Sequence, residues 1–437
     1  MNKIQQSFSN ILSSSLFRSS SVYTISSIIN ASIPFILLPI LTRKLTPADY
    51  GIVAMFQLAV GIIYPFIGIN LDGSIQRKYY DKDKSDFPSY IGSCFVLFLI
   101  SFFIISILFY FLFNYIGELT KIQDIWIKYI LIVAACQFIT AIVLVLYQVK
   151  IQPIKYGILQ ISQSIINLSL TILFVVILNK SWEGRLEAQI ITGIIFAIIS
   201  LVILYKNNSI HFDFKIIDFK NALSFGLPLI PHAIGGILFT SIDRFFLTNL
   251  IGLEQTGNYS VAYQIGAIIS LITISFNSAY VPWLFDKLNR SDFEIKKRIV
   301  TFTYIYFALL ILGAIFLLLF FPIIVSRFVG KGFLNINTYS TFIVFGFVFQ
   351  GMYFMVTNYI IYAQKTYIQA IITISIGLVK LPITYFGILW LGAIGASISY
   401  CLTFFLFFIA TWILSSRVYK MPWGHIFTNK TLLVNGH

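Results

Sequence analysis

The sequence has few charged side chains. Only 11% of its 437 residues are Asp, Glu, Lys or Arg, whereas a soluble domain carries roughly a quarter. Hydrophobic residues make up 58% of the chain, which excludes an ordinary soluble protein and predicts an integral membrane protein. The formal net charge of +14 could suggest nucleic acid. Because the basic residues lie in short loops between apolar runs, we predict no nucleic-acid partner.

Signatures of metal, cofactor and catalytic chemistry are also missing. Cys94, Cys136 and Cys401 each lie in an apolar run without metal-ligand spacing, so neither a disulfide framework nor a zinc site is predicted. The sequence has no Gly-x4-Gly-Lys-Ser/Thr loop and no His-Glu-x-x-His pattern. Asp81-Lys-Asp83 has the Asp-x-Asp form of some glycosyltransferases, but its crowding by lysines favours a solvated charge run. We therefore predict no enzyme activity, no catalytic residue, no metal and no cofactor.

Long apolar runs alternate with short polar segments. A bilayer core of about 30 Å requires about 20 apolar helical residues, and cutting the sequence at charged clusters predicts an all-α polytopic protein of about 12 transmembrane helices. The predicted spans are 22–41, 50–71, 90–113, 126–147, 156–178, 188–205, 222–250, 259–283, 299–321, 338–362, 367–389 and 394–414.

A shorter apolar pattern precedes the first span. Ile4, Phe8, Ile11, Leu12 and Leu16 recur at helical spacing, which predicts a short amphipathic helix lying in the membrane interface. Residues 1–21 are therefore predicted to form an N-terminal interfacial segment.

Lysine and arginine are distributed unequally between the loops. With an even number of spans both termini lie on one side, and most of the 30 Lys and Arg residues fall in the loops and tails of that side. The opposite side has fewer, among them Arg43 and Arg185. Since basic loops remain in the cytoplasm, both termini are predicted to be cytoplasmic, with residues 421–437 as a cytoplasmic tail.

The two halves of the chain share short motifs. Gly184-Arg-Leu-Glu-Ala188 matches Gly392-Ala-Ile-Gly-Ala396, and Ala54-Met-Phe-Gln57 matches Val261-Ala-Tyr-Gln264, at nearly equal offsets of about half the chain. A repeat of six helices per half, with the same orientation, would produce this pattern. Chance similarity between apolar helices is the alternative. The predicted lobes are residues 22–214 and 215–420.

Three charged residues fall inside predicted spans. Asp243 and Arg244 lie in the seventh span and Lys380 in the eleventh, at similar predicted depth. Charges in the membrane usually face a protein interior or a watery cavity. Asp243 can neutralise only one cation, so we predict a net positive pocket. For Asp243 and Lys380 an ion pair that fastens two helices is an equal alternative, whereas the charge of Arg244 is left over and favours binding.

Prolines mark the corresponding first helices of the two predicted lobes. Pro34 and Pro39 lie in the first span, and Pro228 and Pro231 lie in the seventh. Proline removes a backbone hydrogen bond and permits bending. Matched prolines in both halves predict gating elements, although a single membrane proline is usually a packing kink.

Several stretches resemble one known family. The stretch from Ile33 to Gly51, Leu227-Pro-Leu-Ile-Pro-His232 with Asp243-Arg244, Gly257-Asn-Tyr-Ser260 and Gly392-Ala-Ile-Gly-Ala-Ser397 resemble, in order, the polysaccharide-export flippases. These flippases move O-antigen and capsule repeat units, and they form a branch of the multidrug/oligosaccharidyl-lipid/polysaccharide exporter superfamily.

The resemblance implies a MATE-like fold of two six-helix lobes around a central cavity. It also implies a flippase of the bacterial inner membrane that moves undecaprenyl-pyrophosphate-linked repeat units outward by alternating access, in lipopolysaccharide or capsule biosynthesis. The implied partners are the lipid-linked oligosaccharide and membrane lipids. A polysaccharide polymerase and a chain-length regulator in the same membrane are candidate partners.

The basic residues suit such a substrate. Guanidinium groups hold phosphate oxygens bidentately, so Arg244 and Lys380 are candidates for binding the pyrophosphate in the cavity. Arg18 and Arg77, near the inner ends of the first two spans, could collect the head group, although lipid binding or a topology signal is the favoured interpretation for them. Arg43 follows the first span and is the candidate repeat counterpart of Arg244.

Four other classes of protein remain as alternatives. A multidrug exporter of the same superfamily would be expected to place acidic groups in its cavity for cationic drugs. A peptidoglycan-precursor flippase commonly has two further helices. A membrane polysaccharide polymerase would be expected to have a larger outer loop, and a structural scaffold would not require buried charges.

Overall fold

The protein is described by a computed structural model in which every element is a helix. The described residues are 15–81, 87–213, 215–289, 292–333 and 336–424, and they contain no strand. Twelve helical segments of this part are long and apolar enough to cross a membrane. The predicted all-α fold with about 12 transmembrane helices is therefore confirmed.

Some predictions fall on other parts of the chain. The interfacial helix predicted for residues 1–21 lies mostly outside the described residues, and so does most of the tail predicted for residues 421–437. The second half of Asp81-Lys-Asp83 lies outside them as well.

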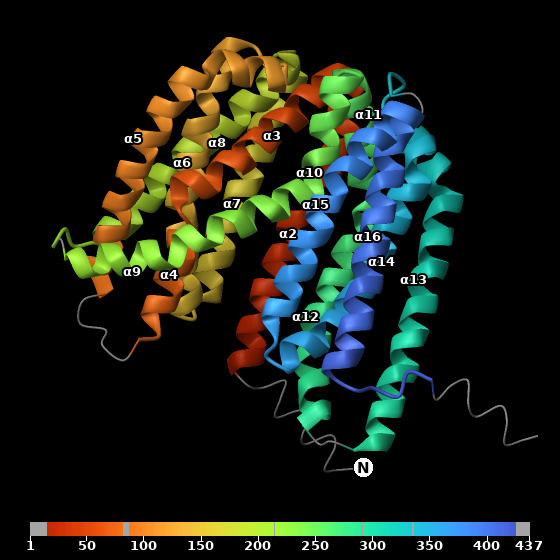
Figure 1. Ribbon diagram of the computed structural model, residues 1–437. Helices are drawn as coiled ribbons and strands as arrows, with labels where there is room; N and C mark the ends of the chain where they lie inside the picture. Colours follow the sequence, from red (N-terminus) through yellow and green to blue (C-terminus); the bar gives the residue numbers. More distant parts are fainter. Residues whose placement is uncertain (1–14, 82–86, 214, 290–291, 334–335, 425–437) are drawn as a thin grey trace, which may run out of the picture. The chain divides into compact units, whose positions relative to one another are not determined.

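Figure 1 traces the helices along the chain. The first part contains α2 (Ser15–Lys44), α3 (Pro47–Gly68), α4 (Leu71–Tyr79), α5 (Phe87–Thr120), α6 (Asp124–Val149), α7 (Pro153–Thr171), the π-helical turn η1 (Ile172–Ile177), α8 (Ser181–Lys206), α9 (Ile216–Gly226), the 3-10 turn η2 (Leu227–Leu229) and α10 (Ile230–Leu250). The second part contains α11 (Leu253–Gly266), α12 (Ile268–Asn289), α13 (Phe293–Phe328), α14 (Ile336–Tyr362), α15 (Thr366–Leu391) and α16 (Ala393–Val418).

The helices form two compact units, Met1–Gly257 and Asn258–His437. In the first unit α6 packs between α3 and α8, and α2 packs along α7. Helices α9 and α10 also belong to this unit, because α9 contacts α4 and α5 while α10 contacts α3 and α5. The compact units are defined by packing, whereas the predicted lobes are defined by a sequence repeat. The lobe boundary between residues 214 and 215 therefore stays a prediction.

The motif Thr46-Pro-Ala-Asp49 starts α3. The hydroxyl of Thr46 accepts a hydrogen bond from the Asp49 backbone N–H at 3.2 Å, and the Asp49 carboxylate accepts one from the Thr46 N–H at 3.0 Å. This capping box satisfies two N–H groups that a helix start leaves without partners. Pro47 suits the first helical turn because its missing N–H is not needed there.

Two glycines bring the start of α3 against the start of α11 within the first unit. A Cβ on Gly51 would lie 2.2 Å from the Leu253 carbonyl oxygen, and a Cβ on Gly257 would lie 1.8 Å from the Pro47 carbonyl oxygen. Neither space admits a side chain, since backbone oxygen atoms cannot rotate away. These glycines come from two of the stretches that carry the family resemblance, so part of that resemblance reflects helix packing.

In the second unit α14 is the central helix. It contacts α12, α13, α15 and α16, and small residues allow the close approach. A Cβ on Gly346 would lie 2.5 Å from the ring of Tyr400 on α16, and a Cβ on Gly351 would lie 2.6 Å from the Thr273 side chain on α12. Small residues at helix contacts are typical of membrane proteins, where close packing replaces the hydrophobic effect as the force between helices.

Large apolar side chains remain exposed along α5 and α13. Examples are Phe103 and Phe111 on α5 and Leu312 and Leu319 on α13. In water such faces would promote aggregation, but in a bilayer they meet hydrocarbon. Large apolar side chains on the outer surface of these helices agree with a chain that spans a membrane.

The prolines have different effects in the two helices predicted to act as gates. Helix α2 continues through Pro34 and Pro39. In the seventh span, Pro228 lies in η2 and Pro231 lies in the first turn of α10, so this span is divided into two α-helices joined by a 3-10 turn. The role of the four prolines in gating stays a prediction.

Candidate functional site

Helix α10 places a carboxylate and a guanidinium side by side in sequence. Asp243 is fully buried, and Arg244 is half-buried. The Nη1 atom of Arg244 donates to the Ser241 hydroxyl at 3.3 Å, one helical turn earlier. Both residues lie inside α10, which ends at Leu250, and their depth in the membrane stays a prediction. The ion pair predicted between Asp243 and Lys380 stays a prediction.

Arg185 is a second arginine in a candidate membrane span of the first unit, although its sequence position predicts an outer loop. Helix α8 begins earlier than predicted, at Ser181, so Arg185 lies within the first turns of the helix. Its Nη1 atom donates to Asn167 Oδ1 at 2.9 Å and to Thr171 Oγ1 at 3.2 Å on α7. Among the described residues no carboxylate pairs with Arg185. Its positive charge is therefore held by neutral acceptors.

Tyr50 interacts electrostatically with both arginines of the first unit. It lies in the first turn of α3, it is buried, and its hydroxyl is within electrostatic range of the guanidinium groups of Arg185 and Arg244. Tyr50, Arg185 and Arg244 are called the arginine cluster below. Three different helices contribute to it, so helix packing creates a cationic region that no single sequence motif contains.

The arginine cluster is suited to anions. A guanidinium presents its N–H donors in a planar fork that matches two phosphate oxygens, and it stays charged at all physiological pH values. A buried phenol adds a further donor. The signal for Arg185 was present in the sequence, because Gly184-Arg-Leu-Glu-Ala188 was recognised as a repeat motif; the error was to start the helix after this motif.

Among the described residues of the second unit, Lys380 is a deeply buried cation. Lys380 on α15 is 1% exposed, and its Nζ atom lies 5.4 Å from the ring centroid of Tyr400 on α16. An ammonium over an aromatic face is stabilised by the ring quadrupole. The two helices meet closely nearby, because a Cβ on Gly395 would lie 1.9 Å from the Gly387 carbonyl oxygen. The motif Gly392-Ala-Ile-Gly-Ala396 thus serves helix packing at the start of α16.

The remaining basic candidates lie near helix ends. Arg43 is exposed in the last turn of α2. Arg77 is exposed on α4, and its guanidinium carbon lies 5.3 Å from the ring centroid of Phe225 on α9. Arg18 lies near the start of α2, where side chains are outside the described residues. The substrate-binding roles of these three arginines and of Lys380 stay predictions.

Asp72 is a partly buried carboxylate that the sequence analysis did not single out. It lies in the first turn of α4, a short helix between two membrane spans. Burial raises the pKa of the Asp72 carboxyl, and the backbone N–H groups of Gly73 and of Asp72 itself partly oppose this shift. Within the described residues, no group of three or more His, Cys, Asp and Glu side chains could hold a metal ion.

The fold resembles transporters of known structure. A multidrug resistance transporter of the MATE family and MOP superfamily, in its inward-facing conformation, matches with a TM-score of 0.68 over 94% of this chain and 96% of that one, at 16% identity. An outward-facing conformation of a MATE family transporter matches with a TM-score of 0.62 over 92% and 95%, also at 16% identity. The protein is thus a multipass membrane protein with the MATE fold.

The sequence defines the family within that fold. A family model described as polysaccharide biosynthesis protein matches residues 16–287, which is more than half of the chain. The chain belongs to this family, and the predicted resemblance to polysaccharide exporters is confirmed.

Curated relatives support this assignment. An uncharacterized membrane protein of Haemophilus influenzae is 26% identical over 80% of this chain and 85% of its own length. The capsular polysaccharide biosynthesis protein CapF of Staphylococcus aureus is 27% identical over 74% of this chain and 80% of its own length. A Shigella flexneri protein named "Putative O-antigen transporter" is 26% identical over 56% of this chain and 59% of its own length.

Proposed function

We propose that the protein is a flippase that moves undecaprenyl-pyrophosphate-linked oligosaccharide repeat units, of O-antigen or capsule, outward across the bacterial inner membrane by alternating access. Family membership supports a role in polysaccharide biosynthesis, and the MATE fold supports transport rather than catalysis. The names of two relatives, which refer to capsule and to O-antigen, point to the same class of substrate.

The observation that carries the proposal is the arginine cluster. Arg185 and Arg244 are cations within candidate membrane spans, and the acceptors of Arg185 within the described part of the chain are neutral. Placing such a charge in a membrane costs free energy, so its presence suggests a functional role. The pyrophosphate of a lipid-linked oligosaccharide supplies oxygen atoms that two guanidinium groups can bind bidentately. A pump for cationic drugs would gain nothing from this arrangement.

The other predicted residues take secondary roles in this proposal. Lys380 is the proposed basic contact of the second unit, and Asp243 is the proposed coupling group or ion-pair partner. Arg18, Arg43 and Arg77 are proposed to attract the head group near the helix ends. Pro34, Pro39, Pro228 and Pro231 are proposed to permit the helix bending that alternating access requires.

The proposal also covers location and partners. The protein would lie in the inner membrane with both termini in the cytoplasm, where the lipid-linked unit is assembled. A polysaccharide polymerase and a chain-length regulator in the same membrane would use the translocated product. No nucleic acid takes part.

Substitution of Arg244 tests the proposed function. Removing a buried charged partner typically costs about 2–5 kcal/mol, so Arg244→Ala should reduce surface polysaccharide by at least roughly tenfold. Arg244→Lys should restore part of it, because the charge is kept and the bidentate fork is lost. Surface polysaccharide is measured by immunoblotting in a strain whose chromosomal copy is deleted.

Arg417→Ala is the matched control, because Arg417 is exposed in the last turn of α16. Its surface polysaccharide should equal that of the wild type, and all variants should show equal protein in the membrane fraction. Full surface polysaccharide in both Arg244→Ala and Arg185→Ala cells would refute the proposal. Increased drug sensitivity of the deletion strain with normal surface polysaccharide would instead favour a multidrug exporter.

A further inference from the structure

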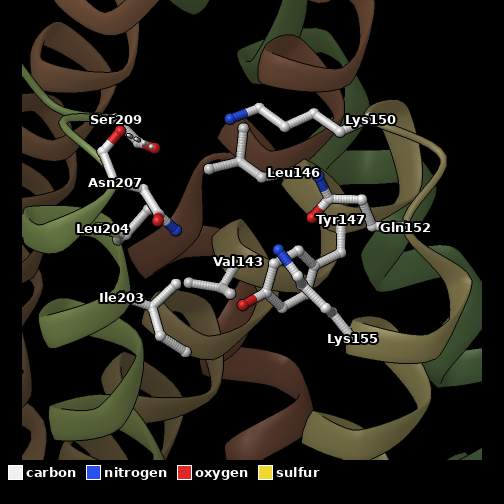
Figure 2. Close-up of a pocket in the computed structure, with 10 residues that line it drawn as sticks. All are labelled: Val143, Leu146, Tyr147, Lys150, Gln152, Lys155, Ile203, Leu204, Asn207 and Ser209. Atoms are coloured by element: carbon white, nitrogen blue, oxygen red, sulfur yellow. Dashed lines mark hydrogen bonds between the residues drawn. The ribbon is translucent and has the colours of Figure 1, made fainter.

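A polar pocket of about 220 Å³ lies in the first unit, at the ends of three membrane helices. Its walls come from the end of α6, the start of α7 and the end of α8 (Figure 2). The apolar part of the lining consists of Val143, Leu146, Ile203 and Leu204. The polar part consists of Tyr147, Lys150, Gln152, Lys155, Asn207 and Ser209.

Two lysines give the pocket its charge. Figure 2 shows Lys150 and Lys155 reaching toward the pocket from different parts of its rim. Among the described residues neither lysine forms an ion pair with a carboxylate. The amide groups of Gln152 and Asn207 line the same space. The pocket thus combines two uncompensated ammonium groups with neutral hydrogen-bond donors.

The turn between α6 and α7 holds these side chains in place. Ile151 adopts a left-handed backbone conformation with φ of 51°, and the Gln152 N–H donates to the Tyr147 carbonyl oxygen at 2.8 Å. Helix α7 then begins at Pro153 with no acidic residue in its first turn. The positive end of the α7 dipole therefore adds to the charge of the lysines and is not neutralised by a carboxylate of its own helix.

Helix α7, which contributes Lys155 to the pocket, also exposes apolar side chains. Ile154, Ile158 and Ile165 are 64%, 64% and 51% exposed, and their spacing places them on one face of α7. A ligand bound in the pocket can thus keep a phosphate near the lysines and an acyl chain along the isoleucines. A small soluble anion would make no contact with this apolar face.

The pocket lies at the end of the first unit that contains the start of the first span. The hydroxyl of Tyr23 on α2 donates to the Tyr147 carbonyl oxygen at 3.3 Å. This end corresponds to the face that we propose to be cytoplasmic. Anionic headgroups on that face attract lysines and arginines close to the membrane surface.

We propose that this pocket binds the phosphate group of an anionic membrane phospholipid, with Lys150 and Lys155 as the phosphate ligands and the α7 isoleucines as the acyl-chain contact. The site would fix a boundary lipid where α6, α7 and α8 end. It differs from the arginine cluster, and its occupancy does not depend on the identity of the transported glycan.

Lipid titration followed by native mass spectrometry tests the proposal on the full-length purified protein. Wild-type protein should bind one phosphatidylglycerol about tenfold more tightly than phosphatidylcholine, as expected for two lysines near one phosphate. The double variant Lys150→Gln/Lys155→Gln should lose this preference. Asn207→Trp keeps both lysines but fills the pocket, and it should lose the preference as well.

The matched control is Lys206→Gln/Lys220→Gln, which removes two exposed lysines that do not line the pocket. It should keep the wild-type preference, and all variants should remain monodisperse with wild-type melting temperatures in phosphatidylcholine. Equal loss in both double variants would show general surface attraction and overturn the proposal. Wild-type binding by Asn207→Trp would overturn it too. If inorganic pyrophosphate displaced the lipid at micromolar concentration, the site would belong to a free anion, and the lipid assignment would be wrong.

Discussion

At the scale of single residues, the chain combines long apolar runs with a few charged side chains whose burial costs free energy. Asp243 and Lys380 are almost completely buried, and Arg185 is held by the neutral side chains of Asn167 and Thr171. An isolated charge in this setting would destabilise the fold. For Arg185 the stabilising partners are the two neutral acceptors, and for Lys380 the ring of Tyr400 is a stabilising contact.

The raised pKa of Asp72 predicts that the stability of the fold depends on pH. Because burial raises its pKa in the folded state, the protonated carboxyl is favoured by folding. The stabilising contribution of the protonated carboxyl is fully present below the unfolded pKa of about 3.9. It is lost as the pH rises through the folded pKa. Asp72→Asn mimics the protonated form, so it should raise the melting temperature in detergent at pH 7 and have little effect at pH 4.

Asp286→Asn is the matched control, because Asp286 is an exposed carboxylate near the end of α12. It should leave the melting temperature within about 1 °C of the wild type at both pH values, as surface substitutions usually do. A lower melting temperature for Asp72→Asn at pH 7 would show that the Asp72 carboxylate is stabilised by partners in the folded state.

At the scale of elements, glycines decide how closely helices pack. Among the glycines of the first unit, Gly257 of α11 leaves the least room for a Cβ, because the Pro47 carbonyl oxygen at the start of α3 lies against it. The capping box of Thr46 and Asp49 holds the same end of α3. One short region therefore combines a helix start, a helix contact and two of the stretches shared with polysaccharide exporters.

Gly257→Ala tests this contact. The new Cβ would lie 1.8 Å from a backbone oxygen, so the helices must separate, and overpacking of this kind costs about 1–3 kcal/mol or more. The melting temperature of the purified protein should fall, and so should its level in the membrane. Gly235→Ala is the control, because no atom lies within 4 Å of its new Cβ. It should be neutral or slightly stabilising, since alanine favours a helix by up to about 1 kcal/mol over glycine. Equal stability of the two variants would contradict the packing geometry.

At the scale of the whole molecule, twelve membrane spans imply that both ends of the described chain lie on one side. Because Lys and Arg are concentrated in the loops of that side, we predict that it faces the cytoplasm. Alkaline phosphatase fusions after Lys206 and after Val418, the ends of α8 and α16, should both be inactive, because this enzyme requires the periplasm. A fusion after Thr120, the end of α5, should be active. An active fusion after Val418 with an inactive one after Lys206 would contradict the even number of spans in the second half.

The class of the protein could be predicted from the sequence because its signals are local. Hydropathy depends on about 20 consecutive residues, so the number of spans and their approximate places follow from composition along the chain. The ends of spans were less certain: α8 begins at Ser181, seven residues before the predicted span, because polar residues in the first turn of a membrane helix look like a loop in sequence.

The sequence by itself determined that this chain is a twelve-span membrane protein, that Asp243, Arg244 and Lys380 lie within spans, and that its motifs are those of polysaccharide exporters. Only the tertiary structure decided that Arg185 and Arg244 both act electrostatically on Tyr50, and that Lys150 and Lys155 line a pocket together with residues of α8. The physical reason is that membrane insertion depends on the total apolar content of each segment, whereas a binding site depends on which helix faces meet. Which helix faces meet is determined by close packing between residues that are far apart in the chain.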